Sequence, residues 1–294
     1  MVKNVLEIRK KCPLCNSKDI KKIFTKKFNQ IKTKQFFKTH LNNKFPMRIL
    51  NNKNYEICEC QNCKLLFQKN ILNKEYNRKF YNDYIDHNKI LNNKNIKKQT
   101  ESYLQSEINL INKIFNSKKI AILEYGAGLG AWVSSLRKAG YKNISAVEIS
   151  KKRRKYLKKK DILNFSSLKG INKRFDLIYS DQTFEHLSQP GKIISDLSKL
   201  LKPNGFLIFK IPPGNFLKKK LNDNYIAGKD EATPLEHINI YTKDTIKFIT
   251  SRYKLKNIKY FFLFKFYDSN FLKFLISYFY HLYVGKKFIL QKKR

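Results

Sequence analysis

The sequence lacks features that would direct the chain out of the cytoplasm. No apolar segment follows Met1, whose neighbours are polar and basic, so a secretory signal is not expected. The most apolar stretch, Tyr260–Val284, is interrupted by two lysines, an aspartate and a histidine, and is a poor membrane span. We expect this stretch to be a buried or partner-facing insertion, or an aromatic and basic helix in peripheral contact with a membrane. The expected location is cytoplasmic.

Acidic residues are scarce, with 22 Asp and Glu against 62 Lys and Arg and a formal net charge of +40. Such a charge is typical of proteins that bind nucleic acid, anionic lipid or another polyanion. The lysines, however, accompany asparagine and isoleucine from end to end, as a general compositional bias would produce. Only Lys151–Lys160 concentrates the charge, and this run is also explained as the solvated face of a helix. Nucleic acid therefore stays an alternative partner.

Cysteine is absent after residue 63, and the earlier part of the chain holds two C-x-x-C motifs. Without a secretory signal, disulfides are disfavoured and metal ligation is favoured. Two such motifs supply the four thiolates of a tetrahedral zinc site. The expected ligands are Cys12, Cys15, Cys60 and Cys63. Residues 16–59 exceed the usual spacing of about 15–20 residues, so Phe24–Met47 would be an insertion, and Cys58 could substitute for Cys60. The alternative is a set of reduced core cysteines.

The patterning divides the chain into three regions. Residues 1–80 contain the cysteines and short strand-like segments, and we expect a zinc-ribbon-like module there. Residues 81–118 form a polar connector that ends in a helix, Glu101–Phe115, with apolar residues at helical spacing. In residues 119–294, apolar strand-like runs alternate with helical patterns, which indicates parallel βαβ units.

The first of these runs, Ile120–Glu124, leads into a turn that contains Gly126 and Gly128. Glycine lets the backbone turn sharply and lets a ligand approach, and the helix that follows offers free N–H groups. The second run ends in Glu148, an acid suited to bind ribose hydroxyls. The glycines with Ala131 also fit the dinucleotide fingerprint, so an NAD(P) enzyme is an alternative. A third interpretation is that the glycines only join a strand to a helix.

Later motifs resemble class I S-adenosylmethionine (SAM)-dependent methyltransferases. The runs Phe175–Leu187 and Leu201–Pro213 contain FDLI, EHL and LKPNG. In that family FDLI opens the fourth strand, EHL begins the next helix, and LKPNG forms the turn into the fifth strand. The loop LEYGAGLG resembles the first motif of the family, and the resemblance extends over residues 100–294. It implies an α/β fold with a Rossmann-like, mostly parallel seven-strand sheet, helices on both faces, and SAM as the methyl donor.

The resemblance also implies roles for individual residues. The two glycines would pass close to the methionine part of SAM, and the acid before them would lie near its ammonium group. Glu148 would accept hydrogen bonds from both ribose hydroxyls, and the next residue would cover one face of the adenine. The third strand is poorly marked, around Ile162–Ser166, so the partner of the adenine amino group is not assigned. The expected cofactor-binding residues are Glu124, Gly126, Gly128, Glu148, Ile149 and Gln182.

Methyl transfer is an in-line displacement, so the enzyme mainly supplies positioning. Attack by a hydroxyl or an enolised carbon also needs a base, for which histidine is suited. His186 lies just past the fourth strand and His237 after the fifth. Each is either the base or a residue that orders the backbone, and His237 could also be a substrate clamp. His237 is favoured as the base because its loop can reach over an acceptor. Glu185 and Tyr241 are weaker candidates.

The cysteine motifs, followed by the Tyr-rich Phe80–Tyr84, resemble the N-terminal zinc-binding region of bacterial methyltransferases that modify sugars or other cell-surface precursors. Those proteins usually have glycine after the last cysteine, where this chain has Lys64. The resemblance implies zinc and a small acceptor, a nucleotide-linked or lipid-linked sugar in polysaccharide biosynthesis. The alternatives are an RNA methyltransferase that uses the basic surface, an NAD(P)-dependent enzyme, and a non-catalytic scaffold that binds SAM or zinc.

Overall fold

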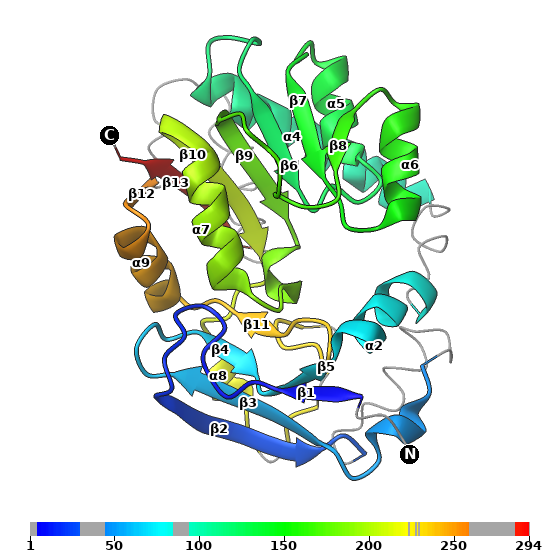
Figure 1. Cartoon of the computed structure of the whole chain (residues 1–294), viewed down its shortest axis with the longest axis vertical. Coiled ribbons are helices and arrows are strands. Elements are labelled where there is room, and N and C mark those ends of the chain that lie inside the picture. The colour runs from blue at the N-terminus through cyan, green and yellow to red at the C-terminus, as the bar shows by residue number, and fades with distance from the viewer. Residues whose placement is uncertain are drawn as a thin grey trace. The chain divides into compact units, whose positions relative to one another are not determined.

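The computed structural model describes residues 5–29, 45–84, 94–222, 224–226, 228, 230–258 and 286–293. They form two compact units (Figure 1). Unit 1 consists of Met1–Ile90, Phe184–Gly191 and Pro212–Phe248, and unit 2 of Leu91–Thr183, Lys192–Ile211 and Ile249–Arg294. Two expected features, the apolar stretch Tyr260–Val284 and residues 30–44 of the insertion between the cysteine motifs, lie outside the described residues.

Unit 2 is built on a seven-stranded sheet with the order β12-β13-β10-β9-β6-β7-β8. The five strands from β10 to β8 run parallel, and β13 is antiparallel to both of its neighbours. The inner parallel strands β6, β7 and β9 are buried along most of their length because both faces of such a sheet are covered. The strands are β6 (Ile122–Tyr125), β7 (Ile144–Val147), β8 (Leu163–Phe165), β9 (Phe175–Asp181), β10 (Leu201–Ile211), β12 (Leu255–Ile258) and β13 (Lys286–Lys292).

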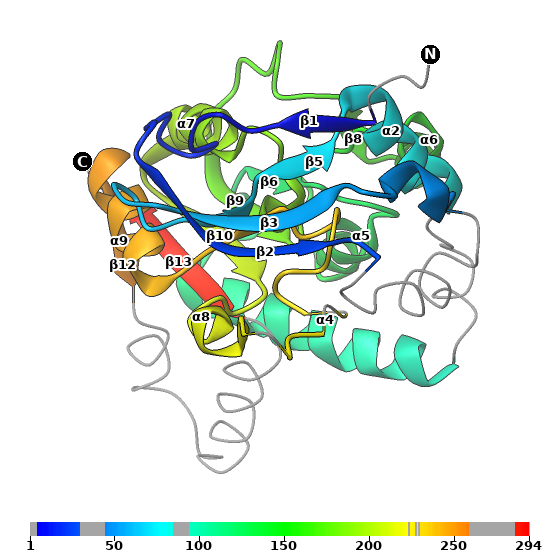
Figure 2. The ribbon, with the colours of Figure 1, turned by 90° about the horizontal axis from the view of Figure 1, so that it is seen from below.

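Helices cover both faces of this sheet, with α7 on one face and α4 on the other (Figures 1 and 2). Ile108 and Ile111 of α4 belong to the same buried cluster as Ile122 and Leu177 of the sheet. The helices are α4 (Lys94–Ile114), α5 (Ala131–Lys138), α6 (Lys151–Lys159), α7 (Pro190–Leu200) and α9 (Lys243–Arg252). The expected α/β fold with a mostly parallel seven-stranded sheet is confirmed. Of the described helices, none combines the length and apolar character that a bilayer span requires.

Three local expectations differ from the structure. The connector helix starts at Lys94 and not at Glu101. The EHL motif does not begin a helix: Phe184–His186 form a short 3-10 turn, η3, and α7 starts only at Pro190, a residue that the first turn of a helix accommodates. The LKPNG motif lies inside β10, at a point where the pairing with β9 shifts register.

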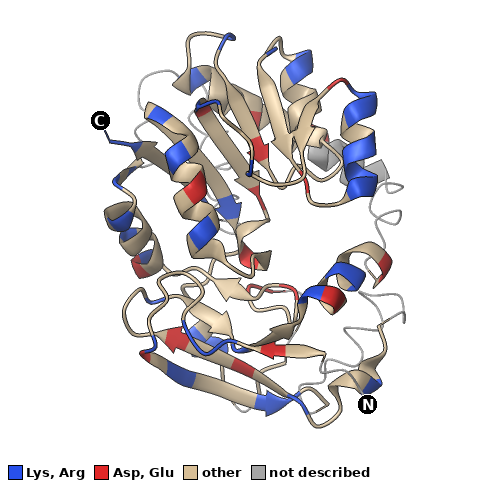
Figure 3. Cartoon of the chain, viewed as in Figure 1, with Lys and Arg blue, Asp and Glu red and all other residues tan. Residues whose placement is uncertain are grey.

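The basic run forms α6, and Figure 3 shows Lys and Arg along this helix. Leu157 is the only residue of α6 that is buried. The Ser150 side chain accepts a hydrogen bond from the Arg153 N–H at 3.4 Å and caps the helix. The positive charges therefore lie on a helix that contacts its unit along a narrow stripe.

Unit 1 contains a four-stranded antiparallel sheet with the order β11-β4-β3-β2, beside a two-stranded sheet of β1 and β5 (Figure 2). Asn239 and Ile240 of β11 pair with Phe67 and Leu66 of β4. The N-terminal region is therefore not closed on itself, and the units differ from the division expected at residues 80 and 118. The elements are β1 (Leu6–Ile8), β2 (Ile20–Lys27), β3 (Asn54–Cys60), β4 (Leu66–Gln68), β5 (Asn70–Leu72), α2 (Lys74–Lys79), α8 (Leu217–Lys220) and β11 (Asn239–Ile240).

Candidate functional site

Three acidic side chains gather at one edge of the unit 2 sheet. Glu124 belongs to β6, Glu148 follows β7, and Asp181 ends β9. Because β6 pairs in parallel with both β7 and β9, the carboxyl ends of these strands meet at the same edge, where open α/β sheets bind ligands. Glu124 and Glu148 are buried. Asp181 was not singled out from the sequence, which marked only the end of its strand.

The loop after β6 is shaped by its glycines. Gly126 has φ +83°, and a Cβ there would stand 2.3 Å from Thr183 Oγ1, so no larger residue fits without a shift. Gly128 has φ +56°, and a Cβ there would meet nothing within 4 Å, so its backbone borders open space. The Gly128 N–H donates to Glu148 Oε2 at 2.8 Å. The loop is thus tied to the end of β7 and leaves room for a ligand.

Glu148 is fixed by the backbone through both oxygens, since its Oε1 accepts from the Ser150 N–H at 2.8 Å. Each carboxylate oxygen has a second lone pair, so the group can still accept from a ligand. Ile149 is 86% exposed and offers an apolar surface at the same strand end. Gln182 is exposed, with φ +47°, and its N–H donates to the Lys210 carbonyl of β10 at 2.9 Å.

Two of the acids have a buried oxygen without a hydrogen-bond partner among the described residues, Glu124 Oε2 and Asp181 Oδ1. Burial raises the pKa of Glu124 well above its usual range, and the charge of Asp181 adds to this. Burial also raises the pKa of Asp181, although the charge of Lys210 lowers it. A buried polar atom without a partner is costly, and a cation beside these two oxygens would remove that cost.

The other oxygen of Asp181 belongs to a chain of hydrogen bonds. The Tyr103 hydroxyl of α4 contacts Asp181 Oδ2 and lies 2.8 Å from the Tyr179 hydroxyl. The Tyr179 hydroxyl in turn lies 3.1 Å from Glu107 Oε2. Three hydrogen bonds join these four groups, but the two hydroxyls supply only two protons. A proton on one carboxyl completes the chain, and the raised pKa of Asp181 makes it the suitable carrier while no ligand is bound.

The four cysteines of the two motifs come together in unit 1, with all four Sγ atoms within 4.8 Å of one another. Cys12 Sγ lies 3.4 Å from Cys63 Sγ, and Cys15 Sγ lies 3.5 Å from Cys60 Sγ. These separations are far longer than a disulfide bond and suit thiolates around one ion at about 2.3 Å. The hydrogen bond from Cys63 is the main cause that lowers the pKa of Cys12, to about 5.

The two motifs have the same backbone geometry. The Asn16 N–H donates to the Cys12 carbonyl and the Lys64 N–H to the Cys60 carbonyl, both at 3.0 Å. Asn16 has φ +63° and Lys64 φ +56°, so each motif ends in the left-handed region. That region favours glycine, which accounts for the glycine that usually follows the last cysteine, and Lys64 adopts the same left-handed conformation here. Cys58, although buried, is not part of the cluster.

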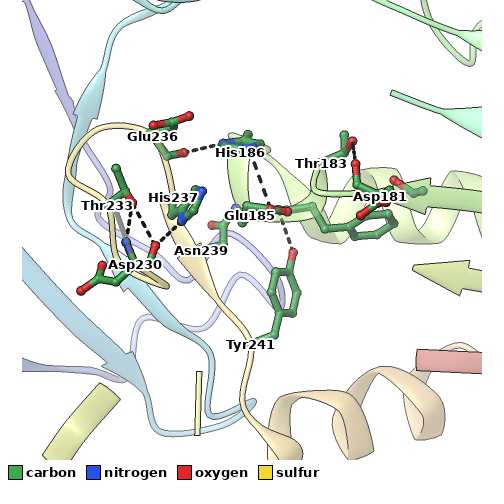
Figure 4. Close-up of polar contacts among 12 residues, drawn as sticks. Asp181, Thr183, Glu185, His186, Asp230, Thr233, Glu236, His237, Asn239 and Tyr241 are labelled. Carbon is green, nitrogen blue, oxygen red and sulfur yellow. Dashed lines mark hydrogen bonds and ion pairs between the residues drawn. The ribbon is translucent and has the colours of Figure 1, made fainter. Parts of the chain in front are cut away.

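His186 and His237 also come together in unit 1, with ring centroids 5.1 Å apart (Figure 4). Glu185 joins them, and the ligand atoms of the three side chains lie within 4.8 Å of one another. Burial lowers the pKa of His186, which favours its neutral ring. The Tyr241 hydroxyl donates to the Phe184 carbonyl at 3.1 Å and so supports the turn that holds Glu185 and His186.

A family model described as a methyltransferase domain matches residues 96–260, which is more than half of the chain. The chain therefore belongs to the methyltransferase-domain family, as its motifs predict. The match covers the glycine loop and the three acids.

A curated relative, malonyl-[acyl-carrier protein] O-methyltransferase of Priestia megaterium (strain DSM 319 / IMG 1521), is 31% identical over 176 residues. The alignment covers 56% of this chain and 60% of the relative, so the chain spans less than two thirds of that protein. A solved SAM-dependent methyltransferase from Mesorhizobium loti is 12% identical, with a TM-score of 0.45 and coverage of 63% of this chain and 96% of that one. The plantazolicin methyltransferase structure is 13% identical, with a TM-score of 0.45 and coverage of 74% and 94%.

The edge of the unit 2 sheet fits SAM. The donor carries a positive sulfonium and a positive ammonium group, and at this edge lie two buried carboxyl oxygens that have no hydrogen-bond partner in the described part of the chain. Glu148 can accept from ribose hydroxyls, and the backbone at Gly128 borders open space. The residues thus match the donor in charge and in hydrogen bonding.

We expect SAM binding to release protons and to tighten as pH rises. In the empty protein the raised pKa values keep Glu124 and Asp181 protonated to a higher pH than ordinary carboxyls. The positive charges of SAM lower both pKa values, so binding releases protons at any pH at which the empty site is still protonated. At higher pH the empty site is already ionised, and binding releases no protons. Calorimetry in buffers of different ionisation enthalpy measures the release. Glu124→Gln should reduce it, and Asp244→Asn, at an exposed position of α9, should not. Proton uptake would contradict the assignment.

Proposed function

We propose that this protein transfers a methyl group from SAM to a small acceptor. The observation that carries the proposal is that one buried oxygen each of Glu124 and Asp181, beside an open glycine loop, has no hydrogen-bond partner among the residues that the structure describes. SAM brings positive charge to that edge. NAD(P) would bring the pyrophosphate against the same acids, and like charges repel. Glu148 would hold the ribose and Ile149 would cover the adenine.

The reaction is a displacement at the methyl carbon. A lone pair of the acceptor forms the new bond to the methyl group while the carbon–sulfur bond breaks and its electrons go to sulfur, which leaves S-adenosylhomocysteine. The positive charge on sulfur disappears in this step, so the acids contribute mainly by placing the donor. An acceptor hydroxyl or enol also loses a proton, which a base must take.

We propose that the histidine pair removes this proton from the acceptor, with His237 as the base and His186 beside it. The His237 Nδ1 donates to the Asp230 carbonyl and the His186 Nδ1 to the Glu236 carbonyl at 2.8 Å, so the Nε2 of each ring has the lone pair. Only four positions of sequence separate Asp181 from Glu185, the residue that joins the pair. We propose that Gln182, which lies between Asp181 and Glu185 in the sequence, contributes to the SAM-binding site.

A sugar or a related nucleotide-linked or lipid-linked precursor is the proposed acceptor, and it rests on the resemblance of the cysteine region to sugar-modifying methyltransferases. The curated relative acts, by its name, on a malonyl group bound to acyl-carrier protein. Both acceptors present an oxygen or an acidic carbon to the donor.

Zinc is the proposed occupant of the cysteine cluster, with Cys12, Cys15, Cys60 and Cys63 as ligands. Four thiolates form a closed structural site, which contributes folding free energy and takes no part in the chemistry.

SAM and S-adenosylhomocysteine should raise the melting temperature of the protein, and NAD should not. Glu148→Ala should weaken SAM binding about 10- to 100-fold, since a charge-assisted hydrogen bond contributes about 1.5–3 kcal/mol. Asp244→Ala, at an exposed position of α9, is the matched control and should leave the shift unchanged. Stabilisation by NAD and not by SAM would show that the donor is wrongly assigned.

The purified, reduced protein should contain zinc in its thiolate site, and Cys12→Ser/Cys15→Ser should lose one ion per chain as measured by inductively coupled plasma mass spectrometry. Cys58→Ser is the control, because Cys58 is buried in β3 but lies outside the cluster. SAM should still raise the melting temperature of the double variant. Equal zinc loss in Cys58→Ser and the double variant would refute this ligand set.

His237→Ala should lower turnover by about 10²–10⁴-fold and leave SAM affinity nearly unchanged, because a base acts on the acceptor and not on the donor. His186→Ala should lower turnover less. The measurement is S-adenosylhomocysteine formation with an acceptor, beside SAM affinity by calorimetry. Near-normal turnover in His237→Ala would remove it as the base, and weaker SAM binding would place it in the cofactor site.

A further inference from the structure

Asp181 and Lys210 stand opposite each other on two parallel strands and yet form no ion pair. The register of β9 and β10 places the two residues side by side. Neighbouring strands are about 4.8 Å apart, so opposite charges at such positions ordinarily pair. Lys210 is only 8% exposed, but in the described part of the chain its ammonium has no carboxylate oxygen within 4.0 Å. The two charges are therefore held apart.

The side chain of Tyr103 on α4 accounts for this separation. Its hydroxyl contacts Asp181 Oδ2, and Lys210 Nζ lies over the face of its ring, 4.2 Å from the centroid. The face of an aromatic ring attracts a cation. One side chain thus occupies one oxygen of the acid and also binds the lysine that could otherwise reach the other oxygen.

Tyr103 is itself fixed by its neighbours in unit 2. Glu107 follows it by one turn on α4, is fully buried, and accepts a hydrogen bond from the Tyr179 hydroxyl at 3.1 Å. The Tyr179 hydroxyl lies 2.8 Å from that of Tyr103. Glu107 also contacts Nζ of Lys287, which stands opposite Lys210 on β13. The lysine of β13 therefore has its own acid, and the lysine of β10 has an aromatic ring in place of one.

We infer that Tyr103 is a positioning residue of the donor site, which keeps Lys210 away from Asp181 so that Asp181 Oδ1 remains available to a positive group of SAM. Without the ring, the ammonium of Lys210 would pair with this oxygen and occupy the place of the donor. Lys210 is in this sense an internal competitor of SAM. The inference rests on the proposed function, because SAM is the cation that Asp181 would receive.

The test is the affinity for SAM, measured by calorimetry on the full-length protein. Tyr103→Phe keeps the ring and loses the hydroxyl, so it should bind SAM about 10-fold more weakly. Tyr103→Leu also loses the ring, and the freed lysine should weaken binding by about another 10-fold. Adding Lys210→Met to Tyr103→Leu should restore the affinity to that of Tyr103→Phe, because the competing ammonium is gone. A purely structural role of the tyrosine would not give this rescue. Undiminished binding by Tyr103→Leu, or a double variant that binds no more tightly than Tyr103→Leu, would overturn the inference.

Tyr141→Phe is the matched control. Tyr141 is fully buried, and its hydroxyl donates to Asn112 Oδ1 of α4 at 2.8 Å. The substitution therefore also removes a tyrosine hydroxyl that ties α4 to the rest of unit 2, but one that binds an amide and not an acid. Its affinity for SAM should equal that of the wild type. An equal loss in Tyr141→Phe and Tyr103→Phe would assign the effect to the packing of α4 and contradict the inference.

A second measurement needs no donor. In a crystal structure of unliganded Tyr103→Leu, Lys210 Nζ should lie within about 4 Å of a carboxylate oxygen of Asp181, the usual limit of an ion pair. A lysine that stays away from the acid in this variant would overturn the inference. Failure of the wild-type protein to bind SAM would instead contradict the proposed function, and the structure of the variant would still show whether Tyr103 separates the two charges.

Discussion

The burial of like charges at the carboxyl edge of the unit 2 sheet is the constraint on which the cofactor side depends. Parallel pairing brings the ends of β6, β7 and β9 together, and each of these ends contributes an acid. Three carboxylates at one edge, two of them buried, are costly as charges unless a proton or a cation accompanies them. The edge therefore favours a positively charged ligand, whatever the shape of that ligand.

Much of the cofactor edge could be predicted from the sequence, because the strand, the glycine turn and Glu148 follow one another within a short segment. Asp181 and its partner Tyr103 could not. Tyr103 reaches Asp181 from α4, where the sequence shows only helical spacing. Similarly, two histidines were identified from separate motifs, but their association with Glu185 depends on how η3 meets the loop before β11.

The N-terminal cysteine region and the segments that follow β9 and β10 share one framework in unit 1. The two-residue strand β11 has no recognisable sequence pattern, so its pairing with β4 could not be predicted. Arg9 is buried and donates to the Ile238 carbonyl at 2.9 Å and to Asn239 Oδ1 at 3.0 Å. Thr242 donates to the Lys64 carbonyl at 3.2 Å, next to the last cysteine. The cysteine motifs thus help to support the loops that carry the histidines.

The pairing of β11 with β4 also constrains the order of events during synthesis. The cysteines have all left the ribosome early, whereas the sheet that they border gains its fourth strand only when Asn239 and Ile240 emerge. Until then the edge of β4 is open, and the buried Gln68 lacks the loop to which it binds. Closing so long a segment costs entropy, so the parallel strands β6, β7 and β8 of unit 2, which are adjacent in sequence and in the sheet, can pair first. An exposed strand edge during that interval is a natural site for a chaperone or for aggregation.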